Sequence, residues 1–202
     1  MIVNEVLEYN SSFVMDDIKG KAFVIDNFLD KFDAEVLEQE MYDWDTFPWY
    51  CVPRNVAGMN ADVDPVHDVY FKHDFFFNAY GVSSSIDIVK PIIKKLVPLS
   101  LVRIRANLNV GGDKPFRFGF HTDFPDIATA IYYVNSNNGL TVFESGEEIE
   151  SVKGRLVLFD SNLTHTTQTQ TDTSTRMLIN FNYVPEAIPY TPGEGTYGRQ
   201  HY

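Results

Sequence analysis

The second half of the chain is a succession of short, strand-sized runs, and this pattern limits the available folds more than any other feature. Between Leu99 and Val184, about eight runs rich in β-branched and aromatic residues are separated by Gly, Asn and Asp. They read SLVRIRANLNV, FRFGFH, IATAIYYVN, LTVFE, EIESV, RLVLFD, HTTQTQT and TRMLINFNYV. No helical pattern intervenes, so we predict an antiparallel sandwich or jelly roll. Asn138-Gly139 predicts a hairpin turn within it.

The first half has a mixed pattern. AFVIDNF is a short apolar run, and the segment after it has apolar residues at the helical spacing of Phe32, Val36, Leu37 and Met41. We expect an amphipathic helix there, capped by Asp30 or Asp33, and a second helix in SSSIDIVKPIIKKLVP. A chain of 202 residues suits one domain. We expect residues 1–98 to form an N-terminal helical or mixed support region, 99–184 the β core and 185–202 a C-terminal extension.

Charge and cysteine content exclude several classes of function. The formal net charge is −12, and no block of Lys and Arg offers the basic stripe that nucleic acid requires. The single cysteine, Cys51, excludes an internal disulfide and a cysteine-rich zinc site, and suits a reducing compartment. No apolar run reaches about 18 residues and no signal peptide is visible. We therefore expect a cytoplasmic protein without nucleic-acid or membrane partners.

A possible metal site lies in the segment FRFGFHTDFPD. His121 and Asp123 are two residues apart, so on a strand they point to the same face, although a polar turn explains the same letters. His165 and Arg176 follow in FDSNLTHTT and DTSTRMLINFNY. Two imidazoles and one carboxylate form the facial triad that binds Fe(II) and leaves coordination positions open. The strands of His165 and Arg176 could pair, or could face each other across about 10 Å.

These residues carry a resemblance to a known family. HTD, THT and STR, in this order and spacing, together with AIYYVN, NGLTVFESG and KGRLVLFDS, resemble the iron(II)- and 2-oxoglutarate-dependent dioxygenases, in particular the prolyl 4-hydroxylase-like branch. The similarity spans roughly residues 99 to 184 and implies a double-stranded β-helix, or jelly roll, with N-terminal helices. It also implies that His121, Asp123 and His165 bind iron and that Arg176 pairs with the distal carboxylate of 2-oxoglutarate.

The resemblance implies further co-substrate contacts and an activity. Tyr133 corresponds to a position whose hydroxyl reaches the same carboxylate. Asn180 shares a strand face with Arg176 and is a candidate co-substrate contact, and Asn107 is a candidate for the proximal end of the co-substrate. The implied enzyme uses Fe(II), 2-oxoglutarate and O2, with ascorbate as a reductant, and releases succinate and CO2. It hydroxylates an unactivated C–H bond, with a peptidyl or free amino-acid prolyl group as the first candidate. A small metabolite is the alternative substrate, and a non-catalytic jelly-roll binding protein is the alternative from another class.

Other polar residues have plainer interpretations. Arg103 and Arg105 alternate with apolar residues on one predicted strand, which indicates a solvated or salt-bridged face, and orientation toward the mouth of the site is the alternative. His67 and His73 could form a second metal pair, but we expect surface or hydrogen-bonded histidines. Tyr132 is expected in the core, because neighbouring residues on a strand face opposite sides.

Overall fold

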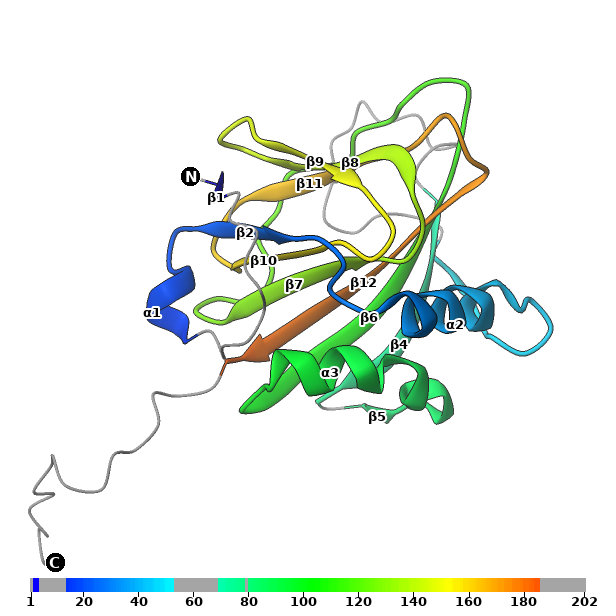
Figure 1. Cartoon of the computed structure of the whole chain (residues 1–202). Helices are drawn as coiled ribbons and strands as arrows, with labels where there is room; N and C mark the ends of the chain where they lie inside the picture. Colours follow the sequence, from blue (N-terminus) through cyan, green and yellow to red (C-terminus); the bar gives the residue numbers. More distant parts are fainter. Residues whose placement is uncertain (1, 4–13, 53–68, 79, 186–202) are drawn as a thin grey trace, which may run out of the picture.

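A computed structural model describes residues 2–3, 14–52, 69–78 and 80–185, and two β-sheets dominate it (Figure 1). The strands are β1 (Ile2–Val3), β2 (Ala22–Ile25), β3 (Tyr50–Val52), β4 (Tyr70–Phe77), β5 (Gly81–Val82), β6 (Ser100–Val110), β7 (Ala128–Tyr133), β8 (Asn137–Phe143), β9 (Glu148–Ser151), β10 (Leu156–Asp160), β11 (His165–Gln168) and β12 (Thr175–Val184). The helical segments are α1 (Met15–Ile18), α2 (Lys31–Tyr42), the 3-10 helix η1 (Ser84–Val89) and α3 (Lys90–Leu96).

The larger sheet has nine strands in the order β1-β2-β10-β7-β12-β6-β4-β3, with β5 attached to β4. The smaller sheet has the order β11-β8-β9. The pairs are antiparallel except for β1 with β2. The prediction of an antiparallel jelly roll is therefore confirmed. The expected boundary at residue 98 stays a prediction, although β4 and β6 pair across it, and residues 186–202 lie outside the described part.

Helices cover one face of the larger sheet, and the smaller sheet faces the other (Figure 1). Along β12 the side chains alternate between these two sides. Met177, Ile179 and Phe181 belong to the main core, which the helices share, whereas Leu178 packs in a second cluster with Tyr133. Tyr132 lies in the main core, as expected. None of the described helices has the length and apolar character that a membrane-spanning helix requires.

Helix α2 is present, but its buried face differs from the predicted one. Asp30 caps the helix by accepting a hydrogen bond from the backbone N–H of Asp33 at 2.9 Å. The buried residues are Ala34, Leu37 and Met41, whereas Phe32 is 73% exposed and Val36 39% exposed. At 3.6 residues per turn, Phe32 and Val36 lie on the side opposite the buried stripe. The apolar spacing therefore predicted the helix correctly and two of its buried residues wrongly.

The second predicted helix is divided in two. Its first part is the 3-10 helix η1, capped by the Ser83 side chain, and the α-helix starts only at Lys90. Pro91 then occupies the first turn of α3, where a missing N–H leaves no hydrogen bond unmade. The proline therefore sets where the α-helix can begin.

Two predictions for the β region are wrong. FRFGFH forms no continuous strand and contributes only isolated bridges, from Arg117 to Gln168 and from His121 to His165. Asn138-Gly139 is not a hairpin turn, because it lies inside β8, where the register with β9 shifts. A Cβ at Gly139 would lie 2.5 Å from Cδ of Arg176. The glycine is thus required for the close approach of another side chain.

Candidate metal centre and pocket

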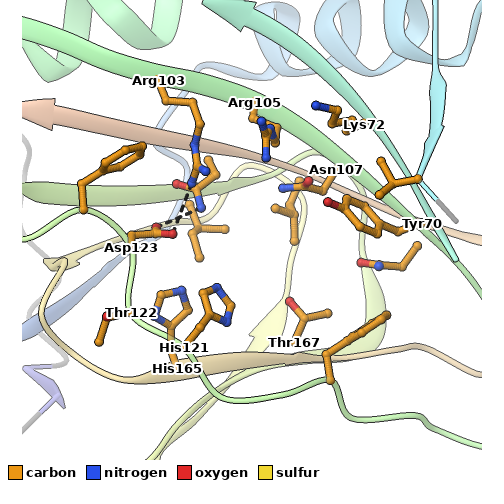
Figure 2. Close-up of a pocket in the computed structure, with 17 residues that line it drawn as sticks. Tyr70, Lys72, Arg103, Arg105, Asn107, His121, Thr122, Asp123, His165 and Thr167 are labelled. Carbon is orange, nitrogen blue, oxygen red and sulfur yellow. Dashed lines mark hydrogen bonds and ion pairs between the residues drawn. The ribbon is translucent and has the colours of Figure 1, made fainter. Parts of the chain in front are cut away.

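Three side chains meet as a possible metal site at the open edge between the two sheets (Figure 2). The ligand atoms of His121, Asp123 and His165 all lie within 4.8 Å of one another. A two-way backbone bridge produces this arrangement, since the N–H of each histidine donates to the carbonyl of the other at 2.9 Å. This bridge holds the first residue of β11 beside the HTD segment, and Asp123 follows two residues after His121.

Backbone carbonyls orient both imidazole rings. Nδ1 of His121 lies 3.3 Å from the carbonyl oxygen of Gly119, and Nδ1 of His165 lies 3.0 Å from that of Leu163. A carbonyl can only accept, so Nδ1 carries the proton and Nε2 of the neutral ring keeps a lone pair for a metal. Burial lowers the pKa of His165 despite the nearby Asp123 carboxylate, which favours this neutral form.

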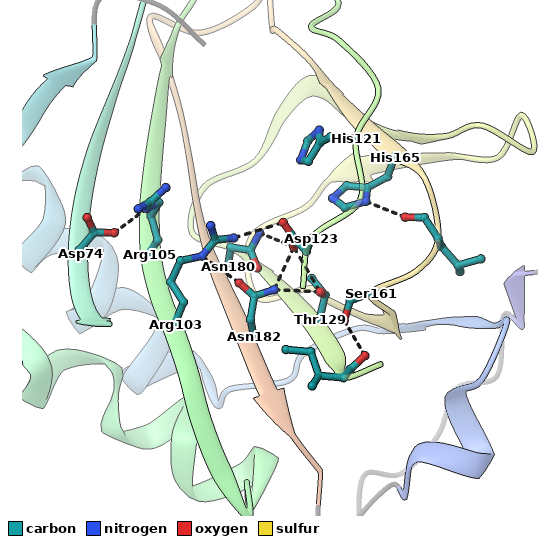
Figure 3. A network of polar contacts seen from close by, with 12 residues as sticks. Asp74, Arg103, Arg105, His121, Asp123, Thr129, Ser161, His165, Asn180 and Asn182 are labelled. Carbon is teal, nitrogen blue, oxygen red and sulfur yellow. Dashed lines mark hydrogen bonds and ion pairs between the residues drawn. The ribbon is translucent and has the colours of Figure 1, made fainter. Parts of the chain in front are cut away.

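The Asp123 carboxylate is held by four side chains on the larger sheet (Figure 3). Arg103 Nη2 donates to Oδ1 at 3.2 Å. Oδ2 accepts from Asn182 Nδ2 at 2.9 Å, and from Thr129 Oγ1 and Asn180 Nδ2 at 3.2 Å each. These donors come from β6, β7 and β12, so three adjacent strands fix one carboxylate.

The same surroundings keep Asp123 ionised. Burial raises the pKa of the carboxyl, but the Arg103 guanidinium, His165 and the hydrogen bond from Asn182 together bring the pKa below its ordinary value. A metal ligand of this type must be deprotonated, so the carboxylate is in the required form at neutral pH.

Arg176 is a fully buried cation next to this cluster. Its exposure is 0%, and its Nε donates to Ser151 Oγ at 2.7 Å. Its terminal nitrogens donate to Thr141 Oγ1 at 3.3 Å and Thr167 Oγ1 at 3.5 Å. No carboxylate among the described residues pairs with it. Burial lowers the pKa of Arg176 to about 10, so it remains charged at pH 7.

The strand arrangement decides between the two possibilities for the strands of His165 and Arg176, pairing in one sheet or facing each other across the core. His165 is on β11 of the smaller sheet and Arg176 is on β12 of the larger sheet, so their strands face each other. Tyr133 is fully buried beside Arg176, with its ring centre 5.6 Å from the guanidinium carbon, and its hydroxyl donates to Thr141 at 2.7 Å. Arg176 and Tyr133 therefore occupy one site between the sheets.

A pocket of about 530 Å³ opens beside the histidines. Of the residues expected at the site, His121, Asp123, His165, Asn107 and Asn180 line it. Arg176 and Tyr133 are fully buried and are not among the residues that line it. Thr167 lines the pocket and accepts a hydrogen bond from Arg176, which connects the buried cation to this space.

Several residues around the site were placed elsewhere, or were not identified, from the sequence. Arg103 and Arg105 are ion-paired, as one interpretation had it, but they face the pocket and not solvent. Period-two alternation on β6 puts them on the same face as Asn107, which the sequence had marked as a site candidate. Lys72 on β4 was not identified, because its strand was not predicted. Extending the alternation of β12 by two residues from Asn180 would have found Asn182.

His73, the remaining histidine of the described residues, does not add to this cluster. His73 is buried, with Nδ1 2.8 Å from the Pro48 carbonyl oxygen and Nε2 2.9 Å from Ser83 Oγ. Both of its ring nitrogens are therefore occupied, which confirms the hydrogen-bonded interpretation. His67, its suggested partner, lies outside the described residues.

Solved structures resemble the chain over most of its length. An oxidoreductase of the 2OG-Fe(II) oxygenase family from Burkholderia pseudomallei has 11% identity and a TM-score of 0.60, covering 91% of this chain and 94% of the other. A Trichoplax adhaerens prolyl hydroxylase in complex with a hypoxia inducible factor peptide fragment has 15% identity and a TM-score of 0.54, covering 81% and 83%. Streptomyces hygroscopicus HygX, with nickel, 2-oxoglutarate and hygromycin B bound, has 13% identity and a TM-score of 0.54, covering 81% and 82%.

No protein-family model and no curated protein matches the sequence. At 11 to 15% identity the likeness to these structures concerns the fold. The chain therefore has the jelly-roll fold of the 2-oxoglutarate- and iron(II)-dependent oxygenases, with a His-Asp-His cluster between its two sheets.

Proposed function

We propose that the chain is an Fe(II)- and 2-oxoglutarate-dependent oxygenase that hydroxylates an unactivated C–H bond. The observation that carries this proposal is the combination of a His-Asp-His cluster with a buried guanidinium that has no carboxylate partner among the described residues. A buried charge is costly unless it is paired, so this cation favours an anionic ligand next to the metal position.

The donor set fits Fe(II). His121, Asp123 and His165 provide two neutral imidazole nitrogens and one carboxylate, which suits a non-haem iron with open positions. The absence of further His, Cys, Asp or Glu ligands from this cluster in the described chain leaves those positions free. When bound, the iron together with 2-oxoglutarate and O2 supplies the oxidising chemistry, with release of succinate and CO2 and with ascorbate as an external reductant.

The chain's own contribution is to position and to neutralise. Arg176 would bind the distal carboxylate of 2-oxoglutarate through its terminal nitrogens, while Nε stays on Ser151 and holds the side chain in place. The Tyr133 hydroxyl now donates to Thr141 and would turn to the same carboxylate. Gly139 leaves room for the Arg176 side chain, since a Cβ would overlap it.

Two further pocket residues are candidates for the rest of the co-substrate. Asn180 donates to Asp123, and its buried Oδ1 has no donor among the described residues. Because 2-oxoglutarate has only acceptor oxygens, Asn180 would contact it through its amide N–H, and the unpaired oxygen is an expected contact point for a donor of the substrate. Asn107 lines the same wall and is the candidate for the proximal end.

For the substrate, a prolyl group of a peptide or a free amino acid is the first candidate, because the sequence motifs are prolyl 4-hydroxylase-like and one similar structure is a prolyl hydroxylase with a peptide. A small metabolite is the second candidate, because another similar structure holds hygromycin B. The cytoplasmic location also stays a proposal, based on the single cysteine.

The test combines metal binding with turnover. Co(II) absorption spectra report coordination, and succinate release is measured with Fe(II), ascorbate and 2-oxoglutarate. His121→Ala and Asp123→Ala should abolish both signals, whereas Asp113→Ala, at an exposed carboxylate outside the cluster, should leave both unchanged. Absence of metal binding and of succinate release in the unmodified chain would exclude the proposed function.

A further inference from the structure

Cationic side chains form the wall of the pocket opposite the histidines (Figure 2). Arg103 and Arg105 extend from β6, and Lys72 extends from the neighbouring β4. Arg105 and Lys72 share a single carboxylate, Asp74, and Arg103 is bonded to Asp123. Three cations thus face two carboxylates on this wall, and one of the two is a proposed metal ligand.

This local charge is opposite in sign to that of the chain as a whole. The sequence has 28 acidic and 16 basic residues and a net charge of −12. Among the residues that line the pocket, however, three are cationic and one, Asp123, is acidic. Random placement of charges on so acidic a chain does not favour such a cluster, and a cleft lined by cations concentrates anions.

Arg105 has binding capacity that the chain itself does not use. It donates to Asp74 through Nε at 2.5 Å, and no described residue accepts a hydrogen bond from either of its terminal nitrogens. The terminal nitrogens of a guanidinium provide four N–H donors, and two of them match the two oxygens of a carboxylate or phosphate. The Arg105 side chain is only 19% exposed, so little solvent competes for this position.

The wall is separate from the position of Arg176. In the pairing of β12 with β6, Arg176 is opposite Asn109, and Arg105 is opposite Asn180. Four residues along a strand correspond to about 13 Å. A 2-oxoglutarate molecule with one end at Arg176 and the other at the metal therefore leaves Arg105 and Lys72 available for a second molecule.

We propose that the substrate carries an oxyanion group, a carboxylate or a phosphate, which binds to Arg105 with Lys72 as the second cation. This inference rests on the proposed function and specifies the class of its substrate. A substrate held in this way has its anionic end on the β4–β6 wall and extends toward the metal on the other side of the pocket. Free amino acids and other small acids fulfil this condition, whereas an internal prolyl residue of a peptide has no such group beside its ring.

The experiment follows the Nε–Hε signals of individual arginines by NMR, using the chain loaded with Zn(II) as an inert metal and saturated with 2-oxoglutarate. Acetate, inorganic phosphate and acetamide are the probes, at constant ionic strength. Acetate or phosphate should shift the Arg105 signal saturably, and whichever binds more tightly identifies the kind of oxyanion. Neutral acetamide should have no such effect.

Substitution tests the assignment to Arg105. Arg105→Met should raise the Kd of the anion, read from the pocket amide signals of Asn107, by about tenfold or more, the worth of one charge-assisted hydrogen bond. Arg155→Met is the matched control, since Arg155 is also 19% exposed, is also bonded to an aspartate through Nε, and does not line the pocket. The control should leave the Kd unchanged.

Asp74→Asn provides a test in the opposite direction, which also serves if Arg105→Met does not fold. It removes the carboxylate that competes for Arg105 and Lys72, so the anion should bind several-fold more tightly. The inference is overturned by the absence of a saturable shift at Arg105, by equal anion binding in Arg105→Met and Arg155→Met, or by an unchanged Kd in Asp74→Asn. The Arg176 signal should shift when 2-oxoglutarate is added, so the absence of that shift would instead indicate that the proposed function is wrong.

Discussion

Replacement of Arg176 by methionine is expected to stabilise the ligand-free chain and to remove most of its stabilisation by 2-oxoglutarate. Methionine keeps much of the length of the side chain and removes the charge. In the ligand-free fold the guanidinium is fully buried among hydroxyl groups, and no carboxylate of the described chain pairs with it. The fold therefore holds a charge whose stabilising partner is the proposed co-substrate.

The magnitude follows from the pKa. Burial lowers the pKa of Arg176 from its ordinary value to about 10, and one pKa unit corresponds to 1.36 kcal/mol, so the charged form is disfavoured by about 3 kcal/mol in the folded chain. The variant loses hydrogen bonds to Ser151 and Thr141, worth about 1 kcal/mol each, and the 3.5 Å contact with Thr167, which is too long to add much. The free energy of unfolding should thus increase by about 1 kcal/mol, which raises Tm by about 2–4 °C for a chain of this size.

Thermal unfolding with Zn(II), with and without 2-oxoglutarate, measures both effects. At a ligand concentration about 100 times the Kd, the unmodified chain should gain about 2.7 kcal/mol. Loss of a buried charged partner costs about 2 kcal/mol or more in binding, which raises the Kd by about thirtyfold or more. Under the same conditions Arg176→Met should therefore lose most of this gain, and Arg155→Met should retain it.

The opposite pattern would refute the reasoning. If Arg176→Met unfolds several degrees below the unmodified chain and still responds fully to 2-oxoglutarate, then Arg176 is a structural residue that its hydroxyl partners suffice to stabilise. In that case the anion site must be sought elsewhere in the pocket.

Three further predictions concern neighbouring features. Gly139→Ala should cost about 1–3 kcal/mol of stability and weaken 2-oxoglutarate binding measured by calorimetry, because its Cβ would lie 2.5 Å from Cδ of Arg176; an unchanged affinity would contradict this. Asn182→Ala should weaken Co(II) binding by about tenfold, because it removes the 2.9 Å hydrogen bond to Asp123, and equal affinity in a metal titration would count against that role. Burial lowers the pKa of His73 in the folded chain. As the pH falls below about 6.5, the unfolded chain therefore binds a proton at this histidine before the folded chain does. The free energy of unfolding in urea should accordingly decrease from pH 7.5 to 5.5, and His73→Gln should reduce that decrease.

Local patterns were sufficient for most strands after residue 99 and for the residues of the His-Asp-His cluster. SLVRIRANLNV is β6 in full, and TRMLINFNYV is β12. The period of two put Arg176 and Asn180 on one face, because a strand leaves its side chains no other arrangement. The HTD and THT segments could be identified as candidate metal ligands because a facial triad requires two histidines and one carboxylate.

Where local patterns failed, a contact distant in sequence had decided the outcome. Asn138-Gly139 has the sequence of a turn, yet both residues lie within a strand. The glycine is required there because Arg176 occupies the space beside it. Phe32 has the spacing of a buried helical residue, yet the helix turns a different stripe to the sheet. In both cases one sequence pattern was compatible with two arrangements, and packing selected between them.

The sequence by itself determined the succession of strands along the β region, the class of fold and the residue types of a candidate metal site, because these depend on periodicity and on the chemistry of individual side chains. Only the tertiary structure decided that β11 and β12 face each other, that three strands hold Asp123, and that β4 places Lys72 beside Arg105. Pairing between strands distant in sequence fixes these contacts, and no local spacing encodes which strands will become neighbours.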